Sequence, residues 1–384
     1  MAETQATRVA LVRGNSLNEW EGALWGALPP EFSVTGFCSV RNAYPTTGLP
    51  YPVVSVRSTT DFRICNAFAQ IVRGRFCYMR GLESRLADFD IAHTAELYYA
   101  YSLQAVRAKQ ANPRLKVVST LWDTSPGRFD RPSIKNFLIR RKMRKIIAEV
   151  IAGTDLFLPV SEAAASCAAS YGVPREKMVI VMPGVMPIAP SPAPSRFDLP
   201  DQGYYLVVNR LVPEKGTHDI LAGWQAFKLA QPNDSAKLVI VGAGPEDARL
   251  HMLARTLGVS HSVIFTGSLA HREVCGLYHG ARALVLASIE TPEWAEQFGY
   301  VLAEALSAGC PVIGTRSGSI PDVLGSGGII VSPASPQDIA VAFGQMADQG
   351  VRQSFSEAAR AQSAKFSAER FAGELSAAYR RVLA

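Results

Sequence analysis

The chain has 384 residues, of which 48% are hydrophobic and 19% charged, and its formal net charge is +6. The length indicates two domains, and the share of apolar residues excludes a disordered protein because their burial can offset the entropy of ordering the chain. No apolar run reaches the ~18–20 residues that cross a bilayer, so no transmembrane helix is expected. The positive charge favours an anionic partner, which leaves nucleotides, phospholipid surfaces and nucleic acids open.

The N-terminal segment and the cysteines indicate the cellular compartment. The first residues, MAETQATRVALVRGN, lack the basic start and the long apolar stretch of a signal peptide. Six cysteines are scattered without a CxxC pair or a His/Cys cluster at zinc spacing: Cys38, Cys65, Cys77, Cys167, Cys275 and Cys310. Reduced thiols in a cytoplasmic protein are therefore expected.

Short β-branched apolar runs alternate with helical stretches along nearly the whole chain. Such runs are typical of parallel strands that are covered by helices on both faces. The predicted strands of the first half are Arg8–Val12, Phe32–Ser39, Asp90–His93, Lys116–Leu121, Asp155–Val160 and Met178–Met182. Those of the second half are Tyr204–Val208, Lys237–Val241, Val263–Phe265, Ala283–Leu286, Pro311–Gly314 and Gly328–Val331. Two such sets predict an α/β protein with two doubly wound domains.

A Pro-rich segment separates the two sets of strands. Residues Pro183–Pro194 (PGVMPIAPSPAP) cannot form a helix or a central strand. We expect an N-terminal domain at residues 1–183, a linker at 184–200 and a C-terminal domain at 201–366. A last helix is predicted at 367–384, where it either caps the second domain or crosses back to the first.

Two glutamates mark the start and the interior of a predicted helix in Glu296–Pro311 (EQFGYVLAEALSAGCP). Glu304 lies among Val, Leu and Ala, so its carboxylate needs a partner to offset desolvation. Glu296 precedes a helix N-terminus, where backbone N–H groups favour an anion. The pair suits a sugar nucleotide, with one carboxylate on sugar hydroxyls and the other on a ribose diol. The alternative is a salt-bridged core Glu304 and a solvated Glu296.

Two cations follow a predicted strand in Val207–Gly216 (VVNRLVPEKG). In an open parallel sheet, ligands bind beyond the carboxyl ends of the strands, where Arg210 and Lys215 would lie. An Arg with a forked donor set and a Lys with a point charge suit a diphosphate. The alternative is a surface loop with two solvated cations.

A glycine-rich turn follows the next predicted strand, in Val239–Glu246 (VIVGAGPE). It begins like a dinucleotide fingerprint, but the third glycine is absent and Pro245 intervenes, so it is weak support for an NAD site. A tight turn that lets a nucleotide approach the backbone at Gly242 and Gly244 is the better interpretation.

Together these motifs resemble the C-terminal half of retaining glycosyltransferases of the GT-B fold, family 4. The family order is R-L-x-x-x-K-G, V-G-x-G-P, F-x-G and then E-x-F-G-x-x-x-x-E-A-x-x-x-G-x-P-V. The chain shows the same order from Arg210–Gly216 through Val241–Pro245 and Phe265–Gly267 to Glu296–Val312. Asp322 stands where the family usually has Glu. The resemblance implies two Rossmann-like domains that face a cleft, with the nucleotide sugar on the C-terminal domain.

The resemblance also implies roles for individual residues. Glu304 would bind the ribose hydroxyls, and Glu296 would contact the donor sugar. Arg210 and Lys215 would neutralise the diphosphate leaving group, which is why no metal is expected. The remaining contacts to the UDP- or GDP-linked donor are assigned to Gly242, Gly244, Phe265, Gln297, Phe298 and Gly299. Residues Ser288–Ala295 could shape the donor or acceptor pocket.

The first half of the chain carries weaker signals. Gly14 and Asn15 follow the first strand, where the family has a glycine loop near the diphosphate. His93 ends another strand and is either a catalytic residue or a packed structural imidazole. Trp122 occupies the place of a family histidine, so that role does not transfer. Asp88-Phe89-Asp90 spells a metal-binding DxD motif, but it leads into a strand and is interpreted as a turn.

A basic amphipathic helix is predicted around Arg140–Lys145, with Met143, Ile146, Ile147 and Val150 on one face. It could rest on anionic lipid at the inner face of the membrane, although such segments are more often domain helices.

The sequence thus predicts a metal-independent retaining glycosyltransferase acting on a glycan, lipid-linked or small-molecule hydroxyl, with no nucleic acid partner. A sugar-nucleotide epimerase and a non-catalytic sugar-nucleotide-binding protein are the alternatives.

Overall fold

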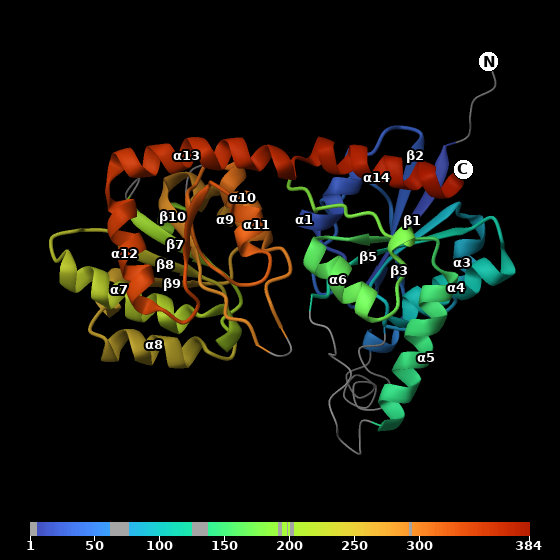
Figure 1. The fold of residues 1–384 in the computed structure, drawn as a ribbon, viewed down its shortest axis with the longest axis horizontal. Helices are drawn as coiled ribbons and strands as arrows, with labels where there is room; N and C mark the ends of the chain where they lie inside the picture. Colours follow the sequence, from blue (N-terminus) through green and yellow to red (C-terminus); the bar gives the residue numbers. More distant parts are fainter. Residues whose placement is uncertain are drawn as a thin grey trace. The chain divides into compact units, whose positions relative to one another are not determined.

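The computed structural model describes residues 6–61, 77–124, 137–190, 194–197, 199, 203–291 and 294–384. The chain divides into two compact units, Met1–Gly184 with Ala368–Ala384 and Val185–Ser367. Each unit holds a six-stranded sheet with helices around it (Figure 1). The last helix therefore belongs to the N-terminal unit, although it follows the C-terminal unit in the chain.

The N-terminal unit is a parallel sheet in the order β3-β2-β1-β4-β5-β6. Its strands are β1 (Thr7–Gly14), β2 (Phe32–Ser39), β3 (Val53–Val56), β4 (Ile91–Ala95), β5 (Lys116–Leu121) and β6 (Leu156–Pro159). Its α-helices are α1 (Glu19–Gly22), α3 (Leu82–Arg85), α4 (Ala100–Ala111), α5 (Phe137–Gly153), α6 (Glu162–Ser170) and α14 (Ala368–Leu383). Short 3₁₀ turns include η1 (Ala23–Ala27) and η3 (Leu86–Asp88).

Both faces of this sheet are covered, because successive side chains of a strand point to opposite sides. Val9 and Leu11 of β1 pack with residues of η1 and α14. Ala10 and Val12 pack with residues of α3 and α4. Consecutive apolar residues of β1 are thus buried on opposite faces, which is the pattern that predicted the strand.

Two strand predictions of the first half differ from the structure. The sequence predicted none at β3, a four-residue strand at the sheet edge. The strand predicted at Met178–Met182 is wrong, since this segment makes only one bridge, between Met178 and Phe157. Val181 still donates its N–H to the Pro159 carbonyl. The ladder stops there because continuing it requires an N–H from Pro159, and proline has none.

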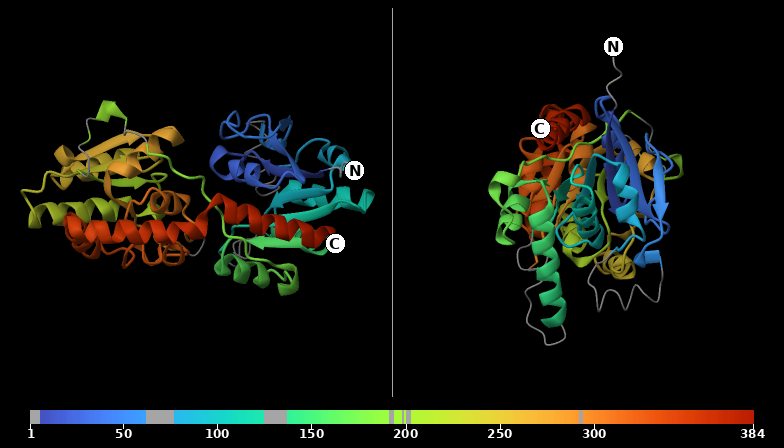
Figure 2. Two further views of the ribbon diagram at one scale, coloured as in Figure 1. Left: turned by 90° about the horizontal axis from the view of Figure 1, so that it is seen from above. Right: turned by 90° about the vertical axis from the view of Figure 1, so that its right-hand side faces the viewer.

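Helix α14 lies against the N-terminal sheet (Figure 2). A buried polar cluster holds it there. The Tyr379 hydroxyl accepts a hydrogen bond from Trp25 Nε1 (3.0 Å) and is hydrogen-bonded to His93 Nδ1 (2.6 Å). His93 Nε2 is hydrogen-bonded to Thr120 Oγ1 (2.7 Å). His93 is fully buried, and this desolvation, with the nearby Arg13 charge, holds its pKa well below the ordinary value.

The catalytic role considered for His93 does not fit this geometry. Both ring nitrogens already have partners, and the ring is covered on one side by Trp25 at 5.3 Å between centroids. The structural interpretation of His93 therefore applies: the imidazole ties β4 and β5 to the C-terminal helix.

The basic helix α5 turns its apolar side chains toward the protein. Met143, Ile146, Ile147 and Val150 are buried in one cluster of the N-terminal unit. Arg141, Lys142, Arg144 and Lys145 are exposed. Its amphipathic pattern is thus explained by packing, and the apolar face proposed to contact lipid is not available for it. Among the described residues, no helix is both long and apolar enough to cross a membrane.

The C-terminal unit has a second parallel sheet, in the order β12-β11-β10-β7-β8-β9. Its strands are β7 (Tyr204–Val208), β8 (Lys237–Val241), β9 (Val263–Gly267), β10 (Ala281–Leu286), β11 (Val312–Thr315) and β12 (Gly328–Val331). Its α-helices are α7 (Thr217–Ala230), α8 (Asp247–Thr256), α9 (His271–Gly280), α10 (Tyr300–Ser307), α11 (Ile320–Leu324), α12 (Pro336–Ala347) and α13 (Gln349–Ser363).

Aromatic side chains fill the core of this unit on one face of the sheet. Tyr205 of β7 contacts Phe343 of α12 edge to face, with ring centroids 4.6 Å apart, and Trp224 of α7 lies 5.2 Å from Phe343. Helices α9 and α10 cover the opposite face. Both faces of the sheet are therefore covered by helices, and its carboxyl edge carries the loops that follow the strands.

The cluster around Tyr379 leads to a stability prediction. Replacing Tyr379 by Phe should lower the free energy of unfolding by about 1–3 kcal/mol, because Trp25 and His93 would each lose a buried hydrogen-bond partner. Urea denaturation of the purified protein measures the change. Tyr78→Phe is the control, since Tyr78 is 43% exposed. Equal stability of the two variants would contradict a structural role for the cluster.

Candidate functional site

The residues singled out in the second half of the sequence gather at the carboxyl edge of the C-terminal sheet. The loop after β7 carries Arg210 and Lys215, and the segment after β10 carries Glu296. Ligands of open parallel sheets bind at this edge. All three residues belong to the C-terminal unit.

Lys215 and Glu296 form a buried ion pair. Lys215 Nζ lies 2.6 Å from Glu296 Oε2, and the two side chains are 13% and 8% exposed. Ser288 Oγ donates a second hydrogen bond to the same oxygen, at 2.7 Å. Trp294 lies beside the ammonium, with Lys215 Nζ 4.6 Å from the ring centroid. No described residue hydrogen-bonds to Glu296 Oε1, so this oxygen can accept from a ligand.

The backbone at Glu296 is fixed by the loop that follows β11. Ser319 donates both its N–H and its hydroxyl to the Glu296 carbonyl, each at 3.0 Å. The neighbouring Gly318 N–H donates to Glu290 Oε1 at 2.6 Å. Two loops thus hold the carboxylate in place before any ligand arrives, which reduces the entropy lost on binding.

Arg210 is exposed at the same edge, and no ion pair links it to a residue that the structure describes. Its loop is held through backbone hydrogen bonds to the glycine-rich turn, from Asn209 to Val241 and from Leu211 to Ala243. A guanidinium with five free donors on a fixed loop is suited to an anionic group.

Gly242 and Gly244 are required by the packing of this loop. A Cβ at Gly242 would lie 1.8 Å from the Asn209 carbonyl oxygen, and one at Gly244 would lie 2.3 Å from the Leu211 carbonyl oxygen. The contact of a nucleotide with these two residues stays a prediction. Both glycines position Arg210 indirectly.

Glu304 is buried inside α10, and both carboxylate oxygens have partners on α9. Oε1 lies 2.8 Å from His271 Nε2, and the Tyr278 hydroxyl donates to Oε2 at 2.8 Å. Hydrogen bonds with Cys275 and with Glu304 raise the pKa of His271 to about 10, so the imidazole is positively charged at neutral pH. In the protein without a ligand, Glu304 is therefore salt-bridged in the core, as the alternative interpretation predicted.

The start of α10 lies directly after Glu296. Gly299 is its N-terminal cap with φ of 72°, a conformation that glycine adopts without strain. Phe298 is buried and packs against Tyr300 and Phe366, so only its backbone can reach a ligand. Gln297 is half-buried at the same turn.

Other residues assigned to the donor lie elsewhere or have packing roles. Phe265 of β9 stacks on His251 of α8, with ring centroids 3.9 Å apart, so its side chain packs against a helix. Gly14 and Asn15 belong to the N-terminal unit at the end of β1. Gly14 is buried beneath Cys77 and Tyr101.

The Asp88-Phe89-Asp90 motif lies at the amino end of β4. This position agrees with its interpretation as a turn that leads into a strand. Asp90 Oδ2 accepts the Arg8 N–H at 2.7 Å, which joins the starts of β4 and β1. Among the described residues, no group of three or more His, Cys, Asp or Glu side chains could hold a metal ion.

Of the cysteines, Cys38, Cys77, Cys167, Cys275 and Cys310 are free thiols, and Cys65 lies outside the described residues.

The sequence did not single out four residues that complete the site. Ser288 and Trp294 contact the Lys215–Glu296 pair, and they lie in the segment Ser288–Ala295 that was expected to shape the donor or acceptor pocket. His271 and Tyr278 hold Glu304. Their spacing of seven residues places them on one helix face, but nothing in the sequence names the carboxylate they contact.

Comparisons with known proteins agree with these features. The family model described as Glycosyltransferase Family 4 matches residues 43–187, and the model described as Glycosyl transferases group 1 matches residues 195–362. The D-inositol 3-phosphate glycosyltransferase of Acidothermus cellulolyticus is 26% identical over 99% of this chain and 84% of its own length. The GDP-mannose-dependent alpha-(1-6)-phosphatidylinositol monomannoside mannosyltransferase of Mycobacterium tuberculosis is 31% identical over 53% of this chain and 55% of its own length.

Solved structures show the same fold. Alr3699/HepE of Anabaena, solved in complex with UDP, has a TM-score of 0.73 at 16% identity, covering 98% of this chain and all of that one. A glycosyltransferase from Rickettsia africae has a TM-score of 0.73 at 15% identity. The two family matches, the parallel sheets and the order of the motifs lead to one conclusion: the chain belongs to the family 4 glycosyltransferases of the GT-B fold.

Proposed function

We propose that this glycosyltransferase moves a sugar from a UDP- or GDP-linked donor to a hydroxyl acceptor, with retention of anomeric configuration and without a metal ion. The observation that carries the proposal is the juxtaposition of cation and carboxylate at the carboxyl edge, Lys215 on Glu296 with Arg210 exposed on the same loop. These groups match the two parts of such a donor, because a diphosphate needs cations and a sugar needs a hydrogen-bond acceptor.

The leaving diphosphate would be stabilised by Arg210, Lys215 and the backbone N–H groups at the start of α10. Lys215 is already held by Glu296, so it needs little reorganisation when the diphosphate binds. Glu296 Oε1 would accept hydrogen bonds from the donor sugar. In a front-face displacement, the leaving oxygen itself takes the proton of the incoming hydroxyl, so no separate base is required on the opposite face.

The ribose would be bound by Glu304. His271 and Tyr278 hold its carboxylate in place through a contact to each oxygen. The donor class is supported by the names of similar proteins, which include a GDP-mannose-dependent enzyme and a structure in complex with UDP. Relatives named for inositol 3-phosphate and phosphatidylinositol mannoside support a polyol or lipid-linked acceptor.

The activity itself can be tested with UDP- and GDP-hexoses and a panel of polyol, polyol phosphate and glycolipid acceptors. We expect release of free nucleoside diphosphate, an α-linked product from an α-linked donor by NMR, and unchanged turnover in excess EDTA. A changed sugar without nucleotide release would identify an epimerase, and binding without turnover would identify a binding protein. Loss of activity in EDTA with rescue by Mn²⁺ or Mg²⁺ would overturn the metal-free mechanism.

Variants at two positions test the site. Arg210→Ala should lower kcat by roughly a hundredfold, about 3 kcal/mol, because one contact to the developing charge is lost. Glu304→Gln should chiefly raise the donor KM. Arg255→Ala is the control for the first variant, since Arg255 is an exposed arginine on α8 of the same unit. Wild-type kinetics in both Arg210→Ala and Glu304→Gln would show that the donor binds elsewhere.

The His271–Glu304 pair predicts a pH dependence of stability. The folded pKa of about 10 lies above the ordinary value of 6.5, so the pair stabilises fully below pH 6.5 and loses its contribution as the pH rises through 10. Wild type should therefore exceed His271→Gln in free energy of unfolding at pH 6, and this excess should decline toward pH 10. Urea titrations at several pH values measure it, with the exposed His261→Gln as control. A pH-independent difference would contradict the ion pair.

A further inference from the structure

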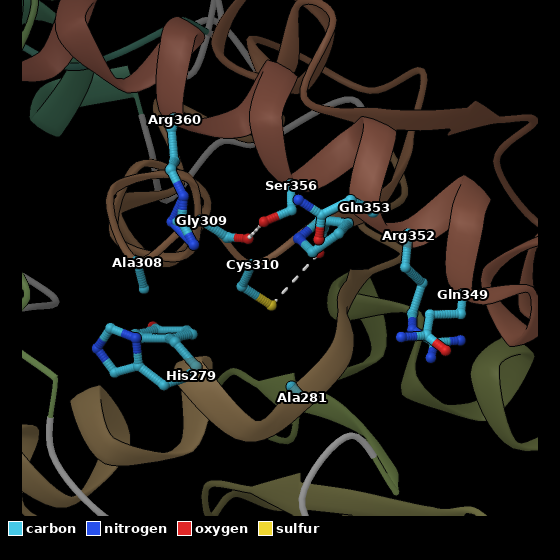
Figure 3. Close-up of a pocket in the computed structure, with 12 residues that line it drawn as sticks. His279, Ala281, Ala308, Gly309, Cys310, Gln349, Arg352, Gln353, Ser356 and Arg360 are labelled. Atoms are coloured by element: carbon cyan, nitrogen blue, oxygen red, sulfur yellow. Dashed lines mark hydrogen bonds between the residues drawn. The ribbon is translucent and has the colours of Figure 1, made fainter.

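A cavity lies at the amino edge of the C-terminal sheet, opposite the edge that carries Lys215 and Glu296. Its volume is about 300 Å³. Ala281 begins β10 and Pro311 directly precedes β11, so the cavity opens where these strands start. Helix α13 forms the facing wall (Figure 3).

The polar side chains that line this cavity are basic or neutral. Arg352 and Arg360 come from α13, and His279 comes from the end of α9 (Figure 3). Gln349, Gln353 and Ser356 add amide and hydroxyl groups. Among the residues that the structure describes, no Asp or Glu lines the cavity. The lining side chains therefore offer hydrogen-bond donors and positive charge.

Arg352 is held in place by the preceding helix. Its Nη1 donates to the carbonyls of Met346 and Ala347 at the end of α12, at 2.9 and 2.7 Å. Partial burial and the nearby Arg282 lower the pKa of Arg352. Asp348 and Asp234 act in the opposite direction and raise this pKa, and Asp234 is also paired with Arg282 at 2.6 Å. An anion in the cavity would add a further favourable interaction with the Arg352 guanidinium.

Arg360 lies across the turn between α10 and β11. Its guanidinium covers Gly309, where a Cβ would come within 2.1 Å of Nη1. Ser356, one turn earlier on α13, donates its hydroxyl to the Gly309 carbonyl at 2.7 Å and ties the helix to that turn. Arg360 is exposed, and no ion pair connects it to any residue in the described part of the chain. Its donors remain available.

We propose that this cavity binds a small soluble phosphorylated ligand that also carries hydroxyl groups. Arg360 can bind a phosphate with forked hydrogen bonds, whereas Arg352, eight residues earlier on α13, the glutamines and the serine suit hydroxyls. The volume lies at the lower end for ligand pockets and suits a single phosphorylated sugar or polyol rather than a nucleotide sugar. This site is separate from the proposed donor site, since the two lie at opposite ends of the same strands.

Isothermal titration with inorganic phosphate and with glucose 6-phosphate tests the proposal. Arg360→Gln should weaken binding of glucose 6-phosphate at least tenfold, and Arg352→Lys should weaken it because the planar fork is lost. Arg210→Ala should leave this binding unchanged, because Arg210 lies at the other edge. Arg255→Gln is the matched control, an exposed arginine near the end of a helix in the same unit.

Three results would overturn the proposal. The first is the absence of binding at millimolar phosphate or glucose 6-phosphate. The second is binding that Arg210→Ala weakens and Arg360→Gln does not, which would assign the probe to the donor site. The third is retention on phosphatidic acid vesicles without binding of either soluble phosphate, which would assign the cavity to a lipid headgroup.

Discussion

The cost of burying a charge organises the C-terminal unit around Glu296 and Glu304. Both carboxylates are nearly inaccessible to water, and an unpaired buried carboxylate would be strongly destabilising. Glu296 is compensated by Lys215 and Ser288, and Glu304 by His271 and Tyr278. The partners come from the loop after β7, the loop after β10 and helix α9. Satisfying two carboxylates thus joins three separate segments into one preorganised site.

The N-terminal unit also pairs its buried polar side chains with one another, but here the hydrogen-bonded groups are uncharged. Trp25, His93, Thr120 and Tyr379 form a continuous buried hydrogen-bonded cluster. Because His93 stays uncharged, no counterion is needed, and the cluster can sit within an apolar core. It joins the last helix of the chain to the first sheet, so that the N-terminal unit is completed only by residues that follow the C-terminal unit.

The two edges of the C-terminal sheet differ in the way their charges are balanced. At the carboxyl edge, each buried carboxylate is paired with a cation. Arg210 is a further cation at this edge, and it is exposed. At the amino edge, Arg352 and Arg360 face a cavity that has no carboxylate among its described lining residues. Helix α10 connects the two regions, since it starts beside Glu296 and ends at the turn covered by Arg360.

The sequence by itself determined the two parallel sheets, the glycosyltransferase motifs and the end of the sheet where Arg210, Lys215 and Glu296 lie. Those features depend on local patterns, namely apolar runs, glycine and proline at turns, and the order of motifs. It did not determine that Gly242 and Gly244 accommodate the chain's own loop, that Phe265 packs on His251, or that His93 is structural. Only the tertiary structure decided these, because each depends on a contact between distant residues. The partners His93 and Tyr379 are 286 residues apart, and no local pattern encodes which buried groups meet when the chain folds.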